Sequence, residues 1–259
     1  MNMNYSHNYF TPINKKEDYP IEIDSSLNDK YYALEYIFDR FYNQSTLDNA
    51  GKNSRSERFE KNLLNDSSFV YGEVNFKSMA YIFEYIKHLY EINSNGIFYD
   101  LGSGIGRGIL AAALCYPFKQ YIGIEYLERL YKDSIEIKNE YIKQLPKFIN
   151  DMKEQNFFPN YNFNNDNNNL PNILFINNDF LNENLSEASL IFANSTCYTQ
   201  DLLDKITEKI NKEVKIGCIV ITTSRALKFD KEKWEILKGV KRMMSWGVAS
   251  IFVHKKNKE

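Results

Sequence analysis

The chain has 259 residues, of which 43% are hydrophobic and 25% are charged, and its formal net charge is −2. This is an ordinary globular composition, and the small net charge excludes the strong overall basic field of many nucleic-acid-binding domains. Three scattered cysteines argue against a disulfide framework, and the chain shows neither a signal-like apolar start nor a run long enough to span a membrane. We therefore expect an intracellular protein with no membrane partner.

Helical periodicity dominates the first ninety residues. Residues 1–28 are polar, and we expect them to be loosely ordered. Large apolar side chains then recur at helical spacing and predict helices over Tyr31–Tyr42, Ser56–Leu64 and Lys77–Ile92.

From residue 97 onward, strand patterns alternate with helical ones. This alternation predicts an α/β fold with a mainly parallel sheet, closed by an antiparallel pair. Pro146 is expected to interrupt or end one long helix, and an asparagine-rich insert at 159–172 is expected to form a flexible surface loop. The predicted strands are Ile97–Leu101, Tyr121–Glu125, Ile173–Asn177, Ser189–Ala193, Gly217–Thr222 and a hairpin-like pair at Met243–Met244 and Ala249–His254, and the predicted helices are Gly108–Cys115, Glu128–Lys153 and Gln200–Lys212.

A glycine-rich loop follows the first of these strands. Asp100 precedes Gly102, Gly104 and Gly106, so the backbone can turn sharply and lie against a ligand. Arg107 stands where a dinucleotide fingerprint requires glycine. The pattern Asp-x-Gly-x-Gly-x-Gly is instead typical of enzymes that use S-adenosylmethionine, and it predicts that cofactor.

Two further acids end the next two strands. Glu125 lies where a carboxylate can accept both ribose hydroxyls of the cofactor. Asp179 can accept a hydrogen bond from the adenine amino group, or it can simply cap the following turn.

The acceptor end of the site is predicted from one amide and three aromatic residues. Asn194 follows the fourth strand, where a carbonyl group could align an incoming amine, although asparagine is also common in turns. Tyr71, Tyr198 and Trp246 are the aromatic candidates for lining the site. The three histidines have no metal-ligand spacing among themselves or with the cysteines, so no metal site is expected.

Five successive motifs resemble those of the non-SET histone-lysine methyltransferases, the family named for disruption of telomeric silencing. They are VYGEVNF, FYDLGSGIGRG, GIE, NDF and LIFANSTCYT, and the resemblance covers roughly Phe69 to His254. It implies a class I, Rossmann-like methyltransferase with a seven-stranded sheet. The implied domains are a partly helical N-terminal extension at 1–68 and a catalytic domain at 69–259.

The resemblance also implies roles for individual residues. Tyr71, Gly72 and Glu73 would fold over the methionine end of the cofactor, and Asn194 would be the active-site asparagine. Tyr198 would be an aromatic residue of the lysine channel, which Asn194 and Trp246 would also shape, and the family's late Ser-Trp pair falls on Ser245 and Trp246. The other cofactor residues implied are Gly102, Gly104, Glu125 and Asp179.

The sequence departs from the family pattern at a few positions. Ser195 replaces a frequent second asparagine, a tyrosine expected near the end falls on Ile251 or Phe252, and only KKNKE stands where the family has a lysine-rich extension. We expect a methyltransferase acting on a lysine of a nucleosomal histone in the nucleus. The basic segment Lys228–Arg242 either contacts DNA weakly or only favours solubility. The alternatives are a methyltransferase of a non-histone protein and a catalytically silent S-adenosylmethionine-binding or scaffold protein.

Overall fold

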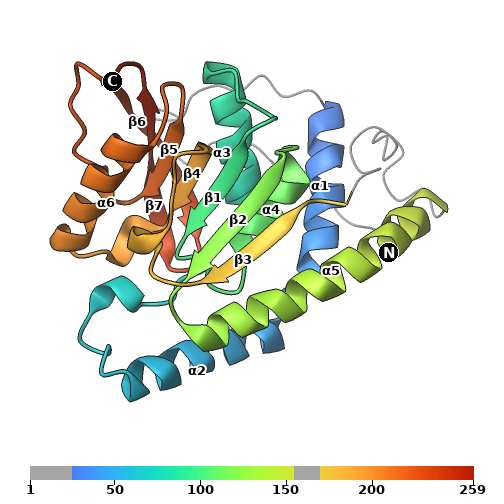
Figure 1. The fold of residues 1–259 in the computed structure, drawn as a ribbon. Coiled ribbons are helices and arrows are strands. Elements are labelled where there is room, and N and C mark those ends of the chain that lie inside the picture. Colours follow the sequence, from blue (N-terminus) through green and yellow to red (C-terminus); the bar gives the residue numbers. More distant parts are fainter. Residues whose placement is uncertain (1–24, 155–169) are drawn as a thin grey trace.

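A seven-stranded sheet forms the centre of the molecule, which the computed structural model describes over residues 25–154 and 170–259 (Figure 1). The strand order is β3-β2-β1-β4-β5-β7-β6, and only β7 pairs in antiparallel fashion with both of its neighbours. The strands are β1 (Ile97–Leu101), β2 (Gln120–Glu125), β3 (Ile173–Asn177), β4 (Ala188–Ala193), β5 (Ile219–Thr223), β6 (Trp234–Met244) and β7 (Gly247–Lys256).

Helices cover both faces of this sheet. Buried side chains of α1, α3, α4 and α5 share one apolar cluster with one face, and those of α6 share a second cluster with the other. The helices are α1 (Ser25–Asp39), α2 (Gln44–Glu60), α3 (Phe76–Leu89), α4 (Arg107–Cys115), α5 (Glu128–Glu154) and α6 (Gln200–Glu213), and three short 3-10 turns are η1 (Ser67–Phe69), η2 (Phe180–Asn182) and η3 (Ser195–Cys197).

Strand β1 shows how the sequence divides between the two clusters. Successive side chains of a strand point to opposite faces. Phe98 accordingly joins the α1–α3–α4–α5 cluster, while Tyr99 and Leu101 join the α6 cluster. Complete burial of one such aromatic side chain stabilises the fold by about 1.5–3 kcal/mol. The predicted class I methyltransferase fold, a mainly parallel α/β sheet closed by an antiparallel strand, is confirmed.

Both predictions for the N-terminal helices place them too late in the chain. The first begins at Ser25 and ends at Asp39, and the second begins at Gln44, twelve residues before its predicted start. Inside α2 only Ala50, Ser54 and Glu57 are buried, so the helix offers little apolar periodicity. Because α1 belongs to the large apolar cluster, the N-terminal extension packs directly against the sheet and its helices. The domain boundary at residues 68 and 69 stays a prediction.

Pro146 does not end α5, which continues to Glu154. The proline lies on the exposed side, where water can solvate the carbonyl that loses its helical partner. On the buried side Tyr141, Leu145 and Ile149 continue across it. Of the asparagine-rich insert, residues 159–169 lie outside the described residues.

The predicted closing hairpin is longer than expected. Strand β6 includes most of the basic segment at 228–242, because an edge strand pairs on one side only and tolerates lysine on its surface. Arg242 is buried with its guanidinium over the Tyr81 ring, so it is not available to bind phosphate at the surface. Lys228 and Lys231 are exposed.

Candidate functional site

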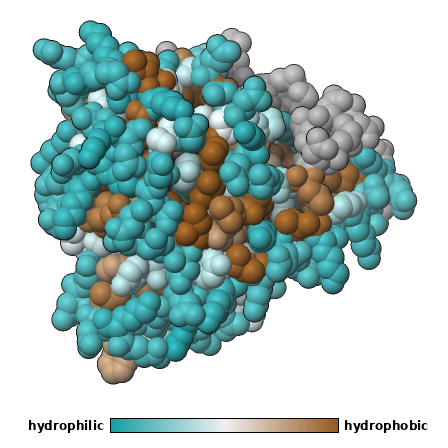
Figure 2. Space-filling model, in the orientation of Figure 1, coloured by the Kyte–Doolittle hydropathy of each residue, from teal (hydrophilic) through white to brown (hydrophobic). Residues whose placement is uncertain are grey.

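A cavity lies where the strand order reverses between β1 and β4. In open parallel sheets ligands bind at this point, outside the carboxyl ends of the strands. The cavity has a volume of about 260 Å³, and the residues predicted for the site line it, except Ser245 and Trp246. On the face of the molecule seen in Figure 2, hydrophilic residues dominate the periphery and hydrophobic residues gather near the centre.

The glycine loop forms the floor of this cavity. Gly102 and Gly104 have φ angles of +81° and +54°, a region that side chains with a Cβ rarely adopt. A Cβ on Gly104 would lie 2.8 Å from Cε2 of Tyr71, so the loop passes directly beneath the tyrosine ring. The loop leads into α4, whose first N–H groups suit an anionic group of a ligand.

Glu125 fixes the loop from below. The residue is 7% exposed, and its two carboxylate oxygens accept hydrogen bonds from the N–H groups of Gly104 and Leu127, each at 2.8 Å. Burial raises the pKa of Glu125, and these N–H groups act in the opposite direction. Each carboxylate oxygen keeps a second lone pair, so the residue can also accept from ribose hydroxyls.

Asp100 is a second buried carboxyl group beside Glu125. Its oxygen lies so close to Gly108 that a Cβ there would approach it to 2.3 Å. Burial and the nearby Glu125 carboxylate raise the pKa of Asp100 to about 8. Two adjoining buried carboxyl groups favour a ligand that carries positive charge.

The segment Tyr71–Val74 forms one wall of the cavity. Nε of Arg107 donates to the carbonyl of Val74 at 2.8 Å, and it lies 3.9 Å from the Glu73 carboxylate. Burial and Glu73 together raise the pKa of Tyr71, so its hydroxyl is neutral at physiological pH. The wall is thus fastened to the first turn of α4.

The turn between β6 and β7 contacts the same wall. Ser245 and Glu73 exchange two hydrogen bonds: the Glu73 N–H donates to the Ser245 hydroxyl at 3.1 Å, and the Ser245 N–H donates to the Glu73 carbonyl at 3.2 Å. Trp246 is 36% exposed, and its ring lies 3.0 Å from the place of a Cβ on Gly72. The structure therefore brings Trp246 against the rim, although it does not line the cavity floor.

Asn194 links this wall to the sheet. Its Nδ2 donates to the Gly72 carbonyl at 3.4 Å, and its Oδ1 accepts from the hydroxyls of Thr223 at 2.7 Å and Thr196 at 3.2 Å. The side-chain amide is therefore held by three partners from separate segments. This arrangement fixes the side chain at the cavity, and its role toward an incoming amine stays a prediction.

Tyr198 and Asp179 also line the cavity. The Tyr198 hydroxyl donates to the Leu101 carbonyl at 2.7 Å, and its ring centroid lies 6.2 Å from that of Phe180. Tyr198 thereby supports the glycine loop, and its place in a lysine channel stays a prediction. Asp179 accepts from the Leu181 N–H at 2.9 Å, so it does cap the turn while also lining the cavity.

Two residues important to this architecture were not predicted as part of the site. Arg107 was considered only as a mismatch to a dinucleotide pattern, and its position directly after the glycines was the available signal. Glu57 lies on α2 and caps α5, a helix that begins about seventy residues later, which no local pattern indicates.

Among residues 25–154 and 170–259, no group of three or more His, Cys, Asp or Glu side chains could hold a metal ion. The helices described in this structure include none that is both long and apolar enough to cross a membrane.

The residues present fit S-adenosylmethionine. The glycine floor leaves room for close backbone approach, and Glu125 offers acceptors suited to ribose. Asp100 and Glu125 are buried carboxyl groups that line the cavity, and a cationic ligand beside them would favour the ionised form of Asp100.

Comparison with known proteins agrees with this geometry. The model of the family described as "Histone methylation protein DOT1" matches residues 55–244. No curated protein matches the chain.

Solved structures with a similar arrangement are distant. A putative S-adenosylmethionine-dependent methyltransferase from Methanococcus maripaludis is 14% identical, with a TM-score of 0.44, over 71% of this chain and 87% of that one. Precorrin-6y C5,15-methyltransferase from Geobacter metallireducens is 12% identical, with a TM-score of 0.39, over 64% and 83%. A putative RNA methyltransferase from Pyrococcus horikoshii is 13% identical, with a TM-score of 0.42, over 70% and 81%.

The family match spans most of the chain and includes the segments that build the cavity. The chain is an S-adenosylmethionine-dependent methyltransferase, and it belongs to the family of the histone methylation protein DOT1.

Proposed function

We propose that this methyltransferase modifies a lysine side chain of a protein, and that the protein is a nucleosomal histone in the nucleus. The observation that carries the proposal is the wall formed by Tyr71–Val74. It covers the glycine loop and meets both Asn194 and the Ser245–Trp246 turn, so polar and aromatic groups gather where an extended amine would enter.

S-adenosylmethionine, when bound, supplies an electrophilic methyl group that passes to the lysine nitrogen as the carbon–sulfur bond breaks. The residues of this chain have to hold the amine in line with that methyl carbon. Alignment of this kind can lower the barrier by about 7–11 kcal/mol. We assign the alignment to Asn194, whose side chain is fixed by Gly72 and Thr223.

The amine must also lose its proton before it can react. Taking a lysine from a pKa of about 10.4 to the neutral form at pH 7 costs roughly 4.6 kcal/mol. A desolvated aromatic environment reduces this cost because it disfavours the ammonium ion. We assign this role to Tyr71 and Trp246, with Tyr198 as the third aromatic residue of the proposed channel.

Transfer of labelled methyl groups tests the proposal. The purified protein is offered intact nucleosomes, free histones and a whole-cell extract, with Asn194→Ala assayed beside it. We expect label on a nucleosomal histone, and we expect the variant to transfer at least about 100-fold more slowly, as when a polar group aimed at a reacting centre is lost. Its affinity for the cofactor should stay within a few-fold.

Other results would change the assignment. Label on a different protein of the extract would refute the histone substrate and retain protein methylation. Tight cofactor binding with no label in any sample would refute the proposal in favour of a silent binding protein. Undiminished transfer by Asn194→Ala would remove that residue from the mechanism.

A further inference from the structure

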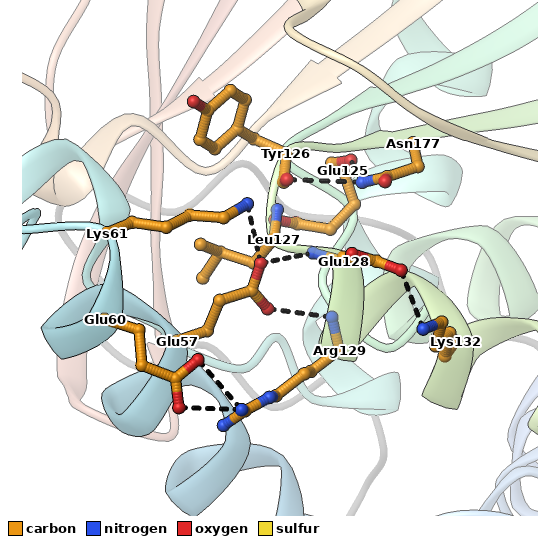
Figure 3. A network of polar contacts seen from close by, with 10 residues as sticks. All are labelled: Glu57, Glu60, Lys61, Glu125, Tyr126, Leu127, Glu128, Arg129, Lys132 and Asn177. Atoms are coloured by element: carbon orange, nitrogen blue, oxygen red, sulfur yellow. Dashed lines mark hydrogen bonds and ion pairs between the residues drawn. The ribbon is translucent and has the colours of Figure 1, made fainter.

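The N-terminus of α5 is capped by a residue from another helix. The first α-helical N–H groups have no partner within their own helix and need an acceptor from elsewhere. Leu127 precedes α5 and offers no side-chain acceptor. Glu57 of α2 accepts from the N–H groups of Glu128 and Arg129, each at 2.8 Å (Figure 3).

Glu57 is built into this position. Its side chain is 5% exposed, and Lys61 one turn later pairs with it at 2.7 Å. Burial opposes its ionisation, but the hydrogen bonds from Lys61 and from the backbone of Arg129 and Glu128 outweigh burial and lower the pKa of Glu57. A carboxylate here also complements the positive end of the α5 dipole.

The same turn holds the carboxylate assigned to the ribose. Glu125 accepts from the Leu127 N–H, directly before the two N–H groups that Glu57 accepts. On the opposite side, Asn177 donates to the Glu125 carbonyl at 2.9 Å. Three successive N–H groups are therefore shared between Glu125 and Glu57, and the turn cannot move without disturbing both.

Lys61 extends the connection from Glu57 to two aromatic residues that line the cavity. Its ammonium lies 4.8 Å from the ring centroid of Tyr126, and that ring packs on Phe69 at 5.2 Å between centroids. Both aromatic residues line the cavity. Helix α2 and its C-cap residue Lys61 therefore contact residues that line the cavity or hold its carboxylate, although neither Glu57 nor Lys61 lines the cavity itself.

We propose that Glu57 is a positioning residue of the cofactor site, and that docking of α2 is coupled to binding of the ribose. Glu57 fixes the turn from Glu125 to Arg129 and so orients the Glu125 carboxylate toward the ribose hydroxyls. The inference rests on cofactor binding and on the ribose role of Glu125. It does not depend on which protein is methylated.

Two probes separate this role from a general loss of structure: S-adenosylhomocysteine and its analogue lacking both ribose hydroxyls. Calorimetry on the full chain measures their Kd values for the wild type, Glu57→Ala, Glu57→Gln and Glu125→Gln. The control is Glu60→Gln, because Glu60 lies on the same helix, its side chain is 55% exposed, and its carboxylate pairs with the side chain of Arg129.

We expect Glu57→Ala to raise the Kd of S-adenosylhomocysteine about tenfold and that of the analogue less than twofold. Glu57→Gln keeps one acceptor oxygen and should give a smaller change in the same direction, which keeps the test informative if the alanine variant does not fold. Glu60→Gln should alter neither value. In the wild type, S-adenosylhomocysteine should slow amide hydrogen exchange in α2 more than the analogue does.

An equal effect of the Glu57 variants on both ligands, or no effect, would overturn the coupling. The inference would also fail if Glu57→Ala and Glu125→Gln were additive in a double-mutant cycle, because residues acting through one turn must be coupled. If Glu125→Gln weakened the binding of both ligands equally, Glu125 would not bind the ribose hydroxyls, and the inference would lose its premise. These measurements report cofactor binding and not methyl transfer. A wrong assignment of the histone substrate would therefore leave them unchanged.

Discussion

Replacing Arg107 by methionine should destabilise the protein and loosen the wall of the cofactor cavity. The arginine side chain is 12% exposed and donates to the Val74 carbonyl, and its guanidinium carbon lies 4.8 Å and 4.7 Å from the ring centroids of Phe38 and Tyr42. A hydrogen bond from a charged donor contributes about 1.5–3 kcal/mol. Each cation–π contact contributes about 0.5–2 kcal/mol.

These stabilising contributions are not additive, and the burial of one unpaired guanidinium nitrogen opposes them. Nη1 of Arg107 is buried without a hydrogen-bond partner among the described residues. Burying such a donor costs about 1–3 kcal/mol of stability, and its removal regains part of that cost. We therefore expect Arg107→Met to lower the free energy of unfolding by about 2–3 kcal/mol. For a chain of this size that loss lowers Tm by roughly 4–12 °C.

Equilibrium denaturation in urea measures the change, with Arg129→Met as the control. The Arg129 side chain is 40% exposed and pairs with Glu60, so its loss should cost less than about 1 kcal/mol. Cofactor affinity should fall only in Arg107→Met, because only that change releases the Tyr71–Val74 segment. Equal, small effects in the two variants would refute the clamp role of Arg107.

Two further changes test the glycine loop and the buried carboxyl group of Asp100. Gly104→Val should abolish measurable binding of S-adenosylmethionine in calorimetry, because φ is +54° and the new side chain would displace the Tyr71 ring; wild-type affinity would contradict this. Asp100→Asn should stabilise the ligand-free protein increasingly as pH rises from 5 to 8. The folded pKa of about 8 lies above the unfolded value of 3.8, so the wild type loses stability over that range, by at most about 1.4 kcal/mol per pH unit. Melting temperatures of both proteins across this range would check the sign, and a constant difference would exclude a raised pKa.

The sheet and the glycine loop could be predicted because their signals are local. The first strand was predicted with the observed bounds, Ile97–Leu101, since a short apolar run ends at an acid and glycines. Glu125 and Asn194 could be placed near the cavity because parallel strands bring their carboxyl ends to one edge. The closeness of Tyr71 to Gly104 depended instead on family resemblance, since 33 residues separate them.

Helix α2 shows where local reasoning fails. Its residues meet α5 through polar contacts, including Asn53 with Asp133 at 2.9 Å and Glu57 with the start of that helix. Such contacts leave no apolar period in the sequence. The capping role of Glu57 depends on a partner about seventy residues away, which only the folded structure identifies.

The pairing of Ser245 with Glu73 also bears on how the protein is made. These residues lie 172 positions apart in the chain, yet their two hydrogen bonds join the cavity wall to the turn between the last two strands. During synthesis the N-terminal parts of a domain emerge first, and contacts between distant segments form late. The nascent chain can therefore complete its cofactor cavity only after β6 and the following turn have left the ribosome, so a ribosome-bound chain halted before residue 245 would hold the glycine loop without its closed wall.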